Sequence, residues 1–464
     1  VSIRMPLMIY GADVPIDEDI DIDKFVELVD EKSWEEFMPK GVTKDIFSQF
    51  TKYYDRDVFI AAGKRIRMLS AAADKETPTK RVQMISDIFK HFKNPDKETV
   101  LTPWRVVNMH MAETLGGWCF FNDKYEDDTD GAKNRLDEPR FVDNEEVTEQ
   151  ALNIHSRVLE INSKSGLYPL YVAYSIYRQK VNGETDDNLD ENYCREIWNE
   201  TIKDNVYVVC KTPMAKSITN RTLRGFTEVP VNTHYFDDLV NMLKSKPDNF
   251  KNKVLKGSYW KKGDKEMKFD AVVGNPPYQV EGEGTRKEPI YHLFYDIAYQ
   301  LAPVVSIISP ARFLFDAGQT PKSWNAKMLS DPHFNVVKYY SDSSEIFPSV
   351  SIKGGIAITI RNAKDNYGEI GEFIASETMR AIINKVKSQS HEFIDSIHFN
   401  RSSYRLSDDL YSDYPDLLNS VKTEEKNSIG SNVFDKIGRV LLETKPKEAK
   451  NYASIFGRES NQRT

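Results

Sequence analysis

The chain has 464 residues and a formal net charge of −8. That length allows two or three domains at the usual size of about 150 residues each, and the acidic balance excludes a uniformly basic nucleic-acid coat, though not a local basic cleft. The cysteines Cys119, Cys194 and Cys210 have neither metal-ligand spacing nor a disulfide pattern, and no signal peptide or bilayer-spanning run occurs, so we expect a cytoplasmic protein without a metal site.

Residues 1–95 are predicted to form a helical lead-in. Apolar side chains recur there at helical spacing, at Ile20, Phe25, Val26 and Val29 and again at Phe47, Phe50, Tyr53 and Tyr54. The second stripe favours a buried helix face over a platform for stacking bases, because such spacing usually marks a core-facing surface. Since the chain starts at Val1, we expect it to be a piece of a longer polypeptide.

The main domain is predicted over residues 96–365. Within it, residues 124–150 are acidic and are expected to form a mobile surface loop. From about Ser156, short apolar runs alternate with helical segments, and the candidate strands are residues 158–161, 206–210, 271–274, 304–308 and 356–360. Runs that are apolar on both faces suit a mostly parallel sheet covered by helices, an α/β fold.

Residues 366–464 are polar and are predicted to form a helical connector followed by the start of another domain. Helical pieces are expected at residues 378–388 and 417–426.

The most informative feature is the tetrapeptide Asn275-Pro276-Pro277-Tyr278, which ends an apolar strand abruptly. The exocyclic amine of adenine is a poor nucleophile because its lone pair is delocalised. The Asn275 side-chain oxygen and the Pro276 carbonyl can each accept one N–H of that amine, favouring its nucleophilic form. The prolines fix the carbonyl, and Tyr278 offers a face on which a flipped base can stack. The alternative is a Pro-Pro strand end with a surface tyrosine.

These residues resemble the Asn-Pro-Pro-Tyr class of amino-methyltransferases, and within it the adenine-N6-specific DNA methyltransferases of fused restriction-modification enzymes. The similarity covers roughly positions 95 to 365. It implies a Rossmann-like methyltransferase sheet, S-adenosylmethionine as cofactor and double-stranded DNA as partner. It also implies that the rest of a restriction-modification polypeptide, with nuclease or helicase and recognition domains, accompanies this chain.

The turn after the first predicted strand is similar to the family's first cofactor motif. Glu160 matches its acidic residue, which can hold the cofactor's ammonium, and Gly166 matches its second glycine. The cofactor-binding residues implied here are Glu160, Asn162, Ser163, Ser165 and Gly166. Lys164 replaces the first glycine and Ile161 the proline, and an ordinary strand followed by a polar turn is the alternative.

Three further segments resemble cofactor motifs, each with an alternative account. Thr102 and Pro103 match residues that flank the methionine moiety, or form a helix N-cap with proline at the first helical position. Cys210 stands at the acidic position that binds the ribose, or is a small buried hydrophobe. Asp237 and Asp238 match the motif near the cofactor's adenine, or are solvated carboxylates at a helix N-terminus.

On the far side of the base, Phe347 matches the family's second stacking residue, although ordinary core packing is the alternative. The Lys353-Gly354-Gly355 sequence resembles a variant of fused restriction-modification enzymes. His292 and Arg312 are candidate phosphate contacts, or simply surface residues.

The sequence therefore predicts methyl transfer from S-adenosylmethionine to N6 of a flipped adenine in DNA. Two rivals stay open: an RNA or protein-glutamine N-methyltransferase, and a non-catalytic DNA-binding or coupling module, which Lys164 and Cys210 favour. We expect the recognition domain to be truncated, because residues 452–458 resemble its opening and the chain stops at Thr464.

Overall fold

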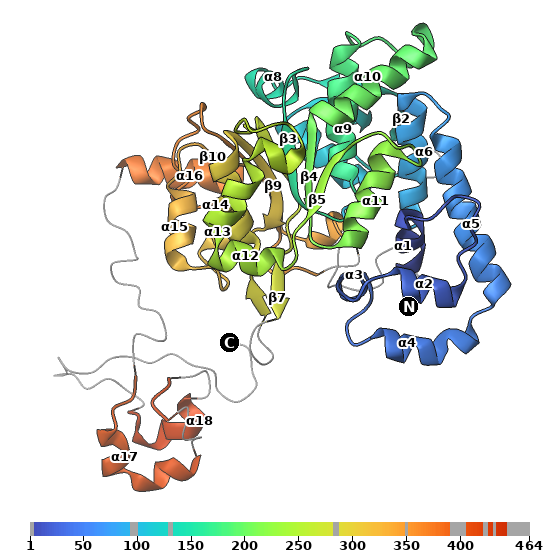
Figure 1. Ribbon diagram of the computed structural model, residues 1–464. Coiled ribbons are helices and arrows are strands. Elements are labelled where there is room, and N and C mark those ends of the chain that lie inside the picture. The colour runs from blue at the N-terminus through green and yellow to red at the C-terminus, as the bar shows by residue number, and fades with distance from the viewer. Residues whose placement is uncertain are drawn as a thin grey trace. The chain divides into compact units, whose positions relative to one another are not determined.

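The structure is a computed structural model that describes residues 4–92, 101–128, 133–281, 287–348, 351–389, 405–420, 426–429 and 433–442. The chain divides into two compact units, Val1–Phe373 and Ile374–Thr464, and each is described by itself. Figure 1 shows their helices and strands with the labels used below.

The first unit is built on one large sheet. Its strands lie in the order β10 (Phe334–Tyr340), β11 (Ile356–Asn362), β9 (Val304–Pro310), β6 (Ala271–Gly274), β3 (Val158–Ser163), β4 (Val206–Cys210) and β5 (Asn232–Tyr235). Strands β9, β6, β3, β4 and β5 are parallel, whereas β11 runs antiparallel to β9 and β10. All the predicted strands lie in this sheet, and the predicted Rossmann-like α/β fold is confirmed.

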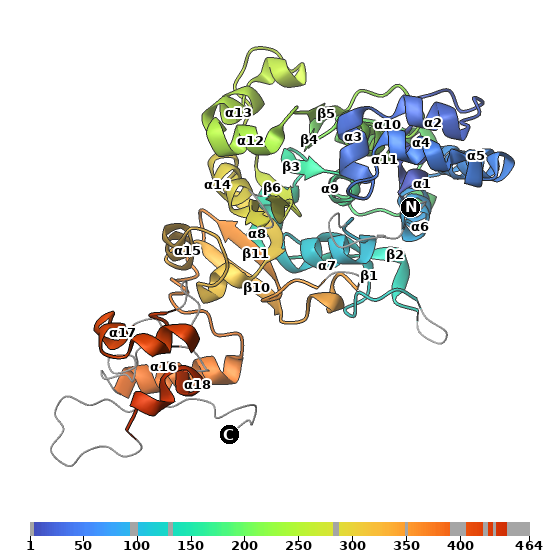
Figure 2. The same ribbon diagram turned by 90° about the horizontal axis from the view of Figure 1, so that it is seen from below.

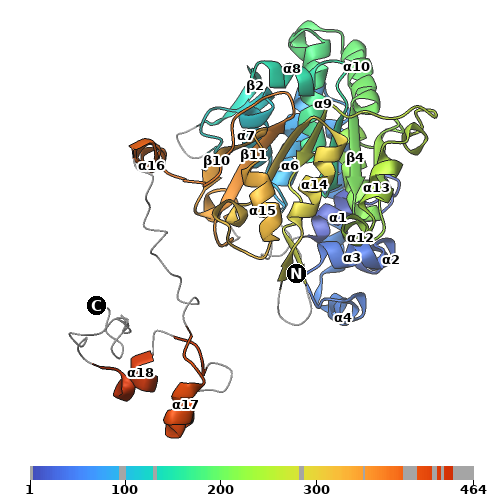
Figure 3. The same cartoon turned by 90° about the vertical axis from the view of Figure 1, so that its left-hand side faces the viewer.

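Successive residues of the central strands face opposite layers of helices. Val158 and Val206 pack in one core, while Leu159 and Tyr207, the next residues along, pack in another. Because both faces are covered, these strands are buried along their length and are mostly apolar. The first core includes α7 (Trp104–Thr114), α9 (Leu167–Lys180), α10 (Glu191–Asp204) and α11 (Pro213–Arg224), and the second includes α12 (Leu239–Ser245), α13 (Pro247–Val254), α14 (Tyr291–Leu301) and α15 (Lys322–Leu329). Figures 2 and 3 show this arrangement from below and from the side.

The predicted N-terminal helices are present and pack against the first layer. They are α1 (Met5–Gly11), α2 (Ile22–Leu28), α3 (Glu31–Phe37), α4 (Lys44–Phe50), α5 (Arg56–Ala73) and α6 (Pro78–Lys90). Helix α1 lies so close to α11 that a Cβ on Gly11 would come 2.3 Å from the Ile218 side chain. Of the second aromatic stripe, Phe47 is buried as expected, but Phe50 and Tyr53 are 53% and 74% exposed, so the core interpretation is wrong for those two.

Residues 124–150 are only partly a loop. They include β2 (Arg135–Val142), which pairs with β1 (Gly117–Phe121), and most of α8 (Glu146–Leu152). The acidic composition predicted a surface loop, but charges in this segment are paired with partners elsewhere in the chain. Glu138, for example, forms an ion pair of 2.6 Å with Arg178. The Trp118 and Phe141 rings pack across the two strands with centroids 5.5 Å apart, which is a stabilising cross-strand contact.

The second unit contains α16 (Glu377–Gln389), α17 (Asp409–Asp413), a 3₁₀ segment Pro415–Ser420 and α18 (Val433–Ile437). The helix expected at residues 378–388 is confirmed. The one expected at 417–426 is in part the 3₁₀ segment, and residues 421–425 and 452–458 lie outside the described residues. Tyr411, Leu417, Val433 and Ile437 form a small apolar core. No helix in the described parts of the chain is long and apolar enough to cross a membrane.

Candidate active site

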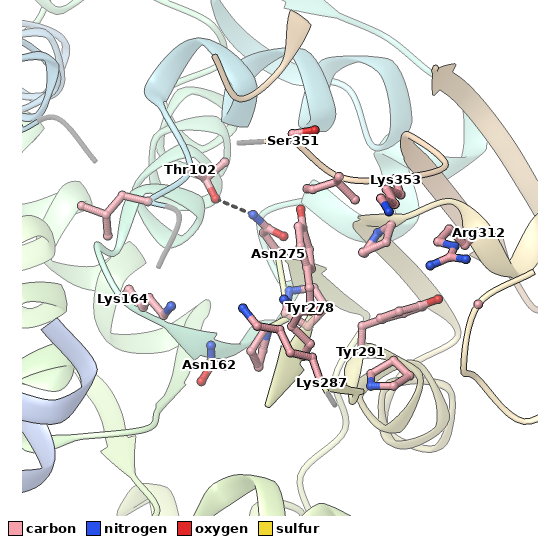
Figure 4. Close-up of a pocket in the computed structure, with 18 of the residues that line it drawn as sticks. Thr102, Asn162, Lys164, Asn275, Tyr278, Lys287, Tyr291, Arg312, Ser351 and Lys353 are labelled. Carbon is pink, nitrogen blue, oxygen red and sulfur yellow. Dashed lines mark hydrogen bonds between the residues drawn. The ribbon is translucent and has the colours of Figure 1, made fainter. Parts of the chain in front are cut away.

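A cavity of about 580 Å³ opens at the carboxyl ends of β3 and β6. From these two central strands the sheet continues through β4 and β5 on one side and through β9 on the other. This is the switch point of a doubly wound sheet, where ligands of such folds bind. Figure 4 shows the side chains that line the cavity.

Asn275 lines the cavity directly after β6. The last residue of that strand, Gly274, has φ of +150°, a conformation that favours glycine. The Asn275 amide nitrogen donates a 3.0 Å hydrogen bond to the Thr102 hydroxyl (Figure 4). The side-chain oxygen is buried and has no hydrogen-bond partner among the described residues. The sequence predicted both residues, and the structure brings them together from distant segments.

Thr102 is not a helix N-cap. The N-cap of α7 is Pro103, and the Thr102 hydroxyl instead accepts the bond from Asn275. Thr102 thereby fixes the orientation of the amide and leaves its oxygen available to a ligand. Pro103 itself does not line the cavity.

Tyr278 lines the cavity together with Pro276 and Pro277. Its hydroxyl is buried without a partner among the described residues, and burial raises the pKa of the phenol well above its usual value. A tyrosine phenol is neutral at physiological pH even at its ordinary pKa, so the ring can contact a flat apolar surface without presenting a charge.

The end of β3 supplies two more unpaired acceptors. The carboxyl oxygen Oε2 of Glu160 and the amide oxygen of Asn162 are buried without partners among the described residues, and both side chains line the cavity together with Ser165. Burial raises the pKa of Glu160 to about 8. An acidic group in such a position is ready to receive a positively charged or hydrogen-bond-donating ligand.

Ser163 and Gly166 do not reach the cavity. The Ser163 hydroxyl accepts bonds from the Gly166 amide at 3.2 Å and from the Thr219 hydroxyl at 3.3 Å. Gly166 has φ of +76°, and a Cβ there would lie 3.1 Å from atoms of Thr219 and Thr222 on α11. The glycine is needed where α9 starts beside α11, and its predicted contact with the cofactor stays a prediction.

The residues expected near the ribose and adenine of a cofactor lie away from the cavity. The Cys210 thiol is fully buried, 3.8 Å from the Thr219 hydroxyl, as the alternative of a small buried hydrophobe requires. Asp237 forms an ion pair of 3.0 Å with Lys32 of α3, and Asp238 accepts a bond from Asn241. All three are absent from the cavity lining, so their predicted role is not supported.

Phe347 and His292 also differ from expectation. Phe347 is 1% exposed and belongs to the first core, so its ring cannot stack on a base in this arrangement. His292 packs edge-on against Trp324 at 5.7 Å, and burial lowers its pKa. Neither residue lines the cavity.

Comparison with known proteins matches residues 204–347 to the Eco57I restriction-modification methylase family. The chain carries an Eco57I-type methylase domain. The matched span includes the Asn275–Tyr278 tetrapeptide, and the predicted relationship to restriction-modification methyltransferases is confirmed.

Individual proteins are similar to a shorter part of the chain, or to most of it at low sequence identity. An "Uncharacterized adenine-specific methylase" of Mycoplasma pneumoniae (strain ATCC 29342 / M129 / Subtype 1) is 31% identical over 108 residues, 22% of this chain and 26% of that protein. The chain thus matches about a quarter of this relative's length. A protein of a type I restriction-modification system is 13% identical, with 85% of this chain and 74% of that one covered and a TM-score of 0.38. The Type ISP enzyme LlaBIII, bound to DNA, is 11% identical, with coverages of 79% and 25% and a TM-score of 0.39.

One side of the cavity is basic. The sequence indicated only some of the residues that make it so. Lys287, Arg312 and Lys353 contribute to the lining, and no motif marked Lys287. Two glycines with positive φ pack on the Arg312 stem: a Cβ on Gly354 would lie 2.4 Å from it, and one on Gly318 would lie 3.4 Å from it. This packing holds the aliphatic part of the Arg312 side chain in place beside the cavity.

A buried polar network lies behind one residue of the cavity lining. The Tyr168 ring lines the cavity, and its hydroxyl bonds to His110 Nδ1 at 2.7 Å, while His110 Nε2 bonds to the Ser306 hydroxyl at 2.8 Å. Burial lowers the pKa of His110 to about 3, so the ring is neutral. Nothing in the sequence marked these residues, because they lie on three separate elements. Elsewhere, the described residues hold no group of three or more His, Cys, Asp or Glu arranged for a metal ion.

Proposed function

We propose that this chain transfers a methyl group from S-adenosylmethionine to N6 of an adenine in DNA, as part of a restriction-modification system. One observation supports the proposal above all. Glu160, Asn162, Asn275 and Tyr278 line a single cavity beside the Asn-Pro-Pro-Tyr turn, and each has a buried polar atom that meets the distance and angle of no hydrogen bond in the described structure. Unpaired buried polar atoms are costly, so their convergence favours a ligand that pairs with them.

At the target base, Asn275 and Pro276 act as paired acceptors. The Asn275 oxygen and the Pro276 carbonyl each take one N–H of the exocyclic amine, which localises the lone pair as charge develops. Thr102 holds the amide so that the oxygen, not the nitrogen, faces the amine. The Tyr278 ring stacks on the base, which must leave the duplex to enter the cavity.

The end of β3 fits the proposed cofactor. Glu160 and Asn162 would hold its amino-acid end, together with the Thr102 and Ser165 side chains that line the same cavity. The bound cofactor supplies an electrophilic methyl group. The protein's part is to align that group with the amine and to exclude water from the cavity.

Cofactor affinity is expected to rise with pH up to about 8. Glu160 is mostly protonated at neutral pH in the empty cavity, because burial raises its pKa to about 8. A cationic ligand favours the ionised carboxylate, so binding strengthens as the pH rises from about 6 toward the pKa. Calorimetric titration between these values should show this dependence, and Glu160→Gln should remove it. An equal slope in both proteins would exclude Glu160 as the titrating group.

The raised pKa of Glu160 has the opposite effect on the stability of the protein without ligand, which decreases as the pH rises. The folded chain keeps the Glu160 proton above the ordinary value of 4.5, whereas the unfolded chain releases it. The free energy of unfolding contributed by this group therefore falls as the pH rises from 4.5 toward 8.

Arg312→Gln and Lys353→Gln are expected to weaken DNA binding without changing cofactor affinity. Each residue lines the side of the cavity that carries the cations and would neutralise one phosphate. Each substitution should reduce the slope of log affinity against log salt concentration by about 1. Filter binding of several unrelated duplexes at two salt concentrations measures this slope. Lys203→Gln, an exposed lysine on α10, is the matched control and should leave the slope unchanged.

The activity itself is tested with S-adenosylmethionine labelled on the methyl group. Duplex DNA, RNA and protein acceptors are each incubated with the chain, and the digested products are separated by mass. N6-methyladenine in DNA supports the proposal. Label in RNA or in a glutamine amide would favour the first rival, whereas DNA binding without cofactor binding would favour a non-catalytic module.

A further inference from the structure

Lys164 is the residue that departs most clearly from the expected cofactor motif. It stands where that motif places a glycine, in the turn between β3 and α9, and its side chain lines the cavity beside Asn162. Figure 4 shows both residues on the opposite side of Asn275 from Arg312 and Lys353. A cation therefore lies at the cofactor end of the cavity.

The backbone of this turn offers few donors to an anion. The amide of Gly166 donates to the Ser163 hydroxyl at 3.2 Å, and the amide of Leu167 donates to the Ser165 hydroxyl at 3.4 Å. The first amides of a helix normally form a ready anion site. Here two of the amides at the start of α9 are used by serines of the same turn, so an anion at this place needs a side-chain partner.

We propose that Lys164 binds the carboxylate of the cofactor's amino-acid end. This assignment rests on the proposed function and deepens it. The carboxyl of Glu160 and the ammonium of Lys164 line one cavity and are complementary to an ammonium and a carboxylate carried on the same carbon. Lys164 then replaces the missing glycine by a direct charge-assisted bond, instead of blocking the site.

The test compares S-adenosylmethionine with its decarboxylated form, which keeps the ammonium and the sulfonium and lacks only the carboxylate. Wild-type protein should bind S-adenosylmethionine about 10- to 100-fold more tightly, the usual effect of a charge-assisted bond. Lys164→Met should lose this preference by weakening S-adenosylmethionine alone. Lys203→Met is the matched control on α10 and should keep the wild-type preference. Thermal unfolding of each variant shows that the fold is retained.

Other outcomes overturn the assignment. If Lys164→Met binds S-adenosylmethionine as wild type does, or loses both compounds equally, the carboxylate is held elsewhere. Tighter binding by the variant would show that Lys164 obstructs the site. If the wild-type protein binds neither compound, the proposed function itself is wrong. If it binds both compounds equally well, only the assignment of the carboxylate to Lys164 is wrong.

Discussion

Asn275→Ala is expected to lower the rate of methyl transfer about 10²- to 10³-fold, the usual cost of one lost preorganised hydrogen-bonding group at a reacting centre. Asn275 lines the cavity, and its buried side-chain oxygen has no partner in the described structure, so we expect this acceptor to be available to the amine. Cofactor affinity should change little, because the acceptors at the end of β3 remain. Transfer of labelled methyl to duplex DNA measures the rate, and calorimetry measures the affinity.

Thr102→Val provides a matched test of the same interaction. Valine keeps the volume and removes the hydroxyl that accepts the 3.0 Å bond from the Asn275 amide. The acceptor oxygen stays but is no longer oriented, so we expect a loss of rate smaller than that of Asn275→Ala. Near-normal turnover of Asn275→Ala would reject the proposed role, whatever the outcome for Thr102→Val.

The central strands could be predicted because burial on both faces makes them mostly apolar. β5 and β10 could not be predicted in this way, since they lie at the edges of the sheet. β5 reads Asn-Thr-His-Tyr, and most of β10 is only half-buried, with Lys338 paired to Glu113 of α7. Because an edge strand has one side open to solvent or loops, its sequence contains more polar residues and is not recognised as an apolar run.

The part of the site whose residues are close together in the sequence could be predicted. Asn275, Pro276, Pro277 and Tyr278 are consecutive, and Glu160 and Asn162 follow one strand, so their common placement at the carboxyl ends of β6 and β3 follows from the fold. Arg312 and its packing against Gly318 and Gly354 depend on a turn that joins distant segments. No spacing in the sequence encodes that contact.

A tertiary contact explains why the residues of the second and third cofactor motifs do not line the cavity. Helix α3 of the N-terminal region covers the ends of β4 and β5: Lys32 pairs with Asp237, and the Ser33 hydroxyl accepts a 3.0 Å bond from the Met214 amide. Glu36 of the same helix accepts a bond from Thr212, directly beyond β4. These contacts join segments about 200 residues apart, and pattern alone does not predict them.

Phe347→Ala is expected to destabilise the first unit by about 3 to 5 kcal/mol, the usual cost of removing a buried phenylalanine. The ring is 1% exposed and lies in the first core, and the preceding segment is held by Arg105, which donates 3.1 Å bonds to the carbonyls of Glu345 and Ile346. Urea unfolding measures the loss, and Phe347→Leu, which refills most of the space, should recover much of it.

The kinetic result for Phe347 separates core packing from base stacking. If the ring only packs, folded Phe347→Leu enzyme should keep the wild-type KM for DNA, because no atom of Phe347 lines the cavity. If the ring stacks on the target base, leucine should weaken DNA binding by about 1 to 3 kcal/mol with little change in the free energy of unfolding. That second outcome would require the segment around Phe347 to rearrange when DNA binds, and it would support the stacking role that the sequence suggested.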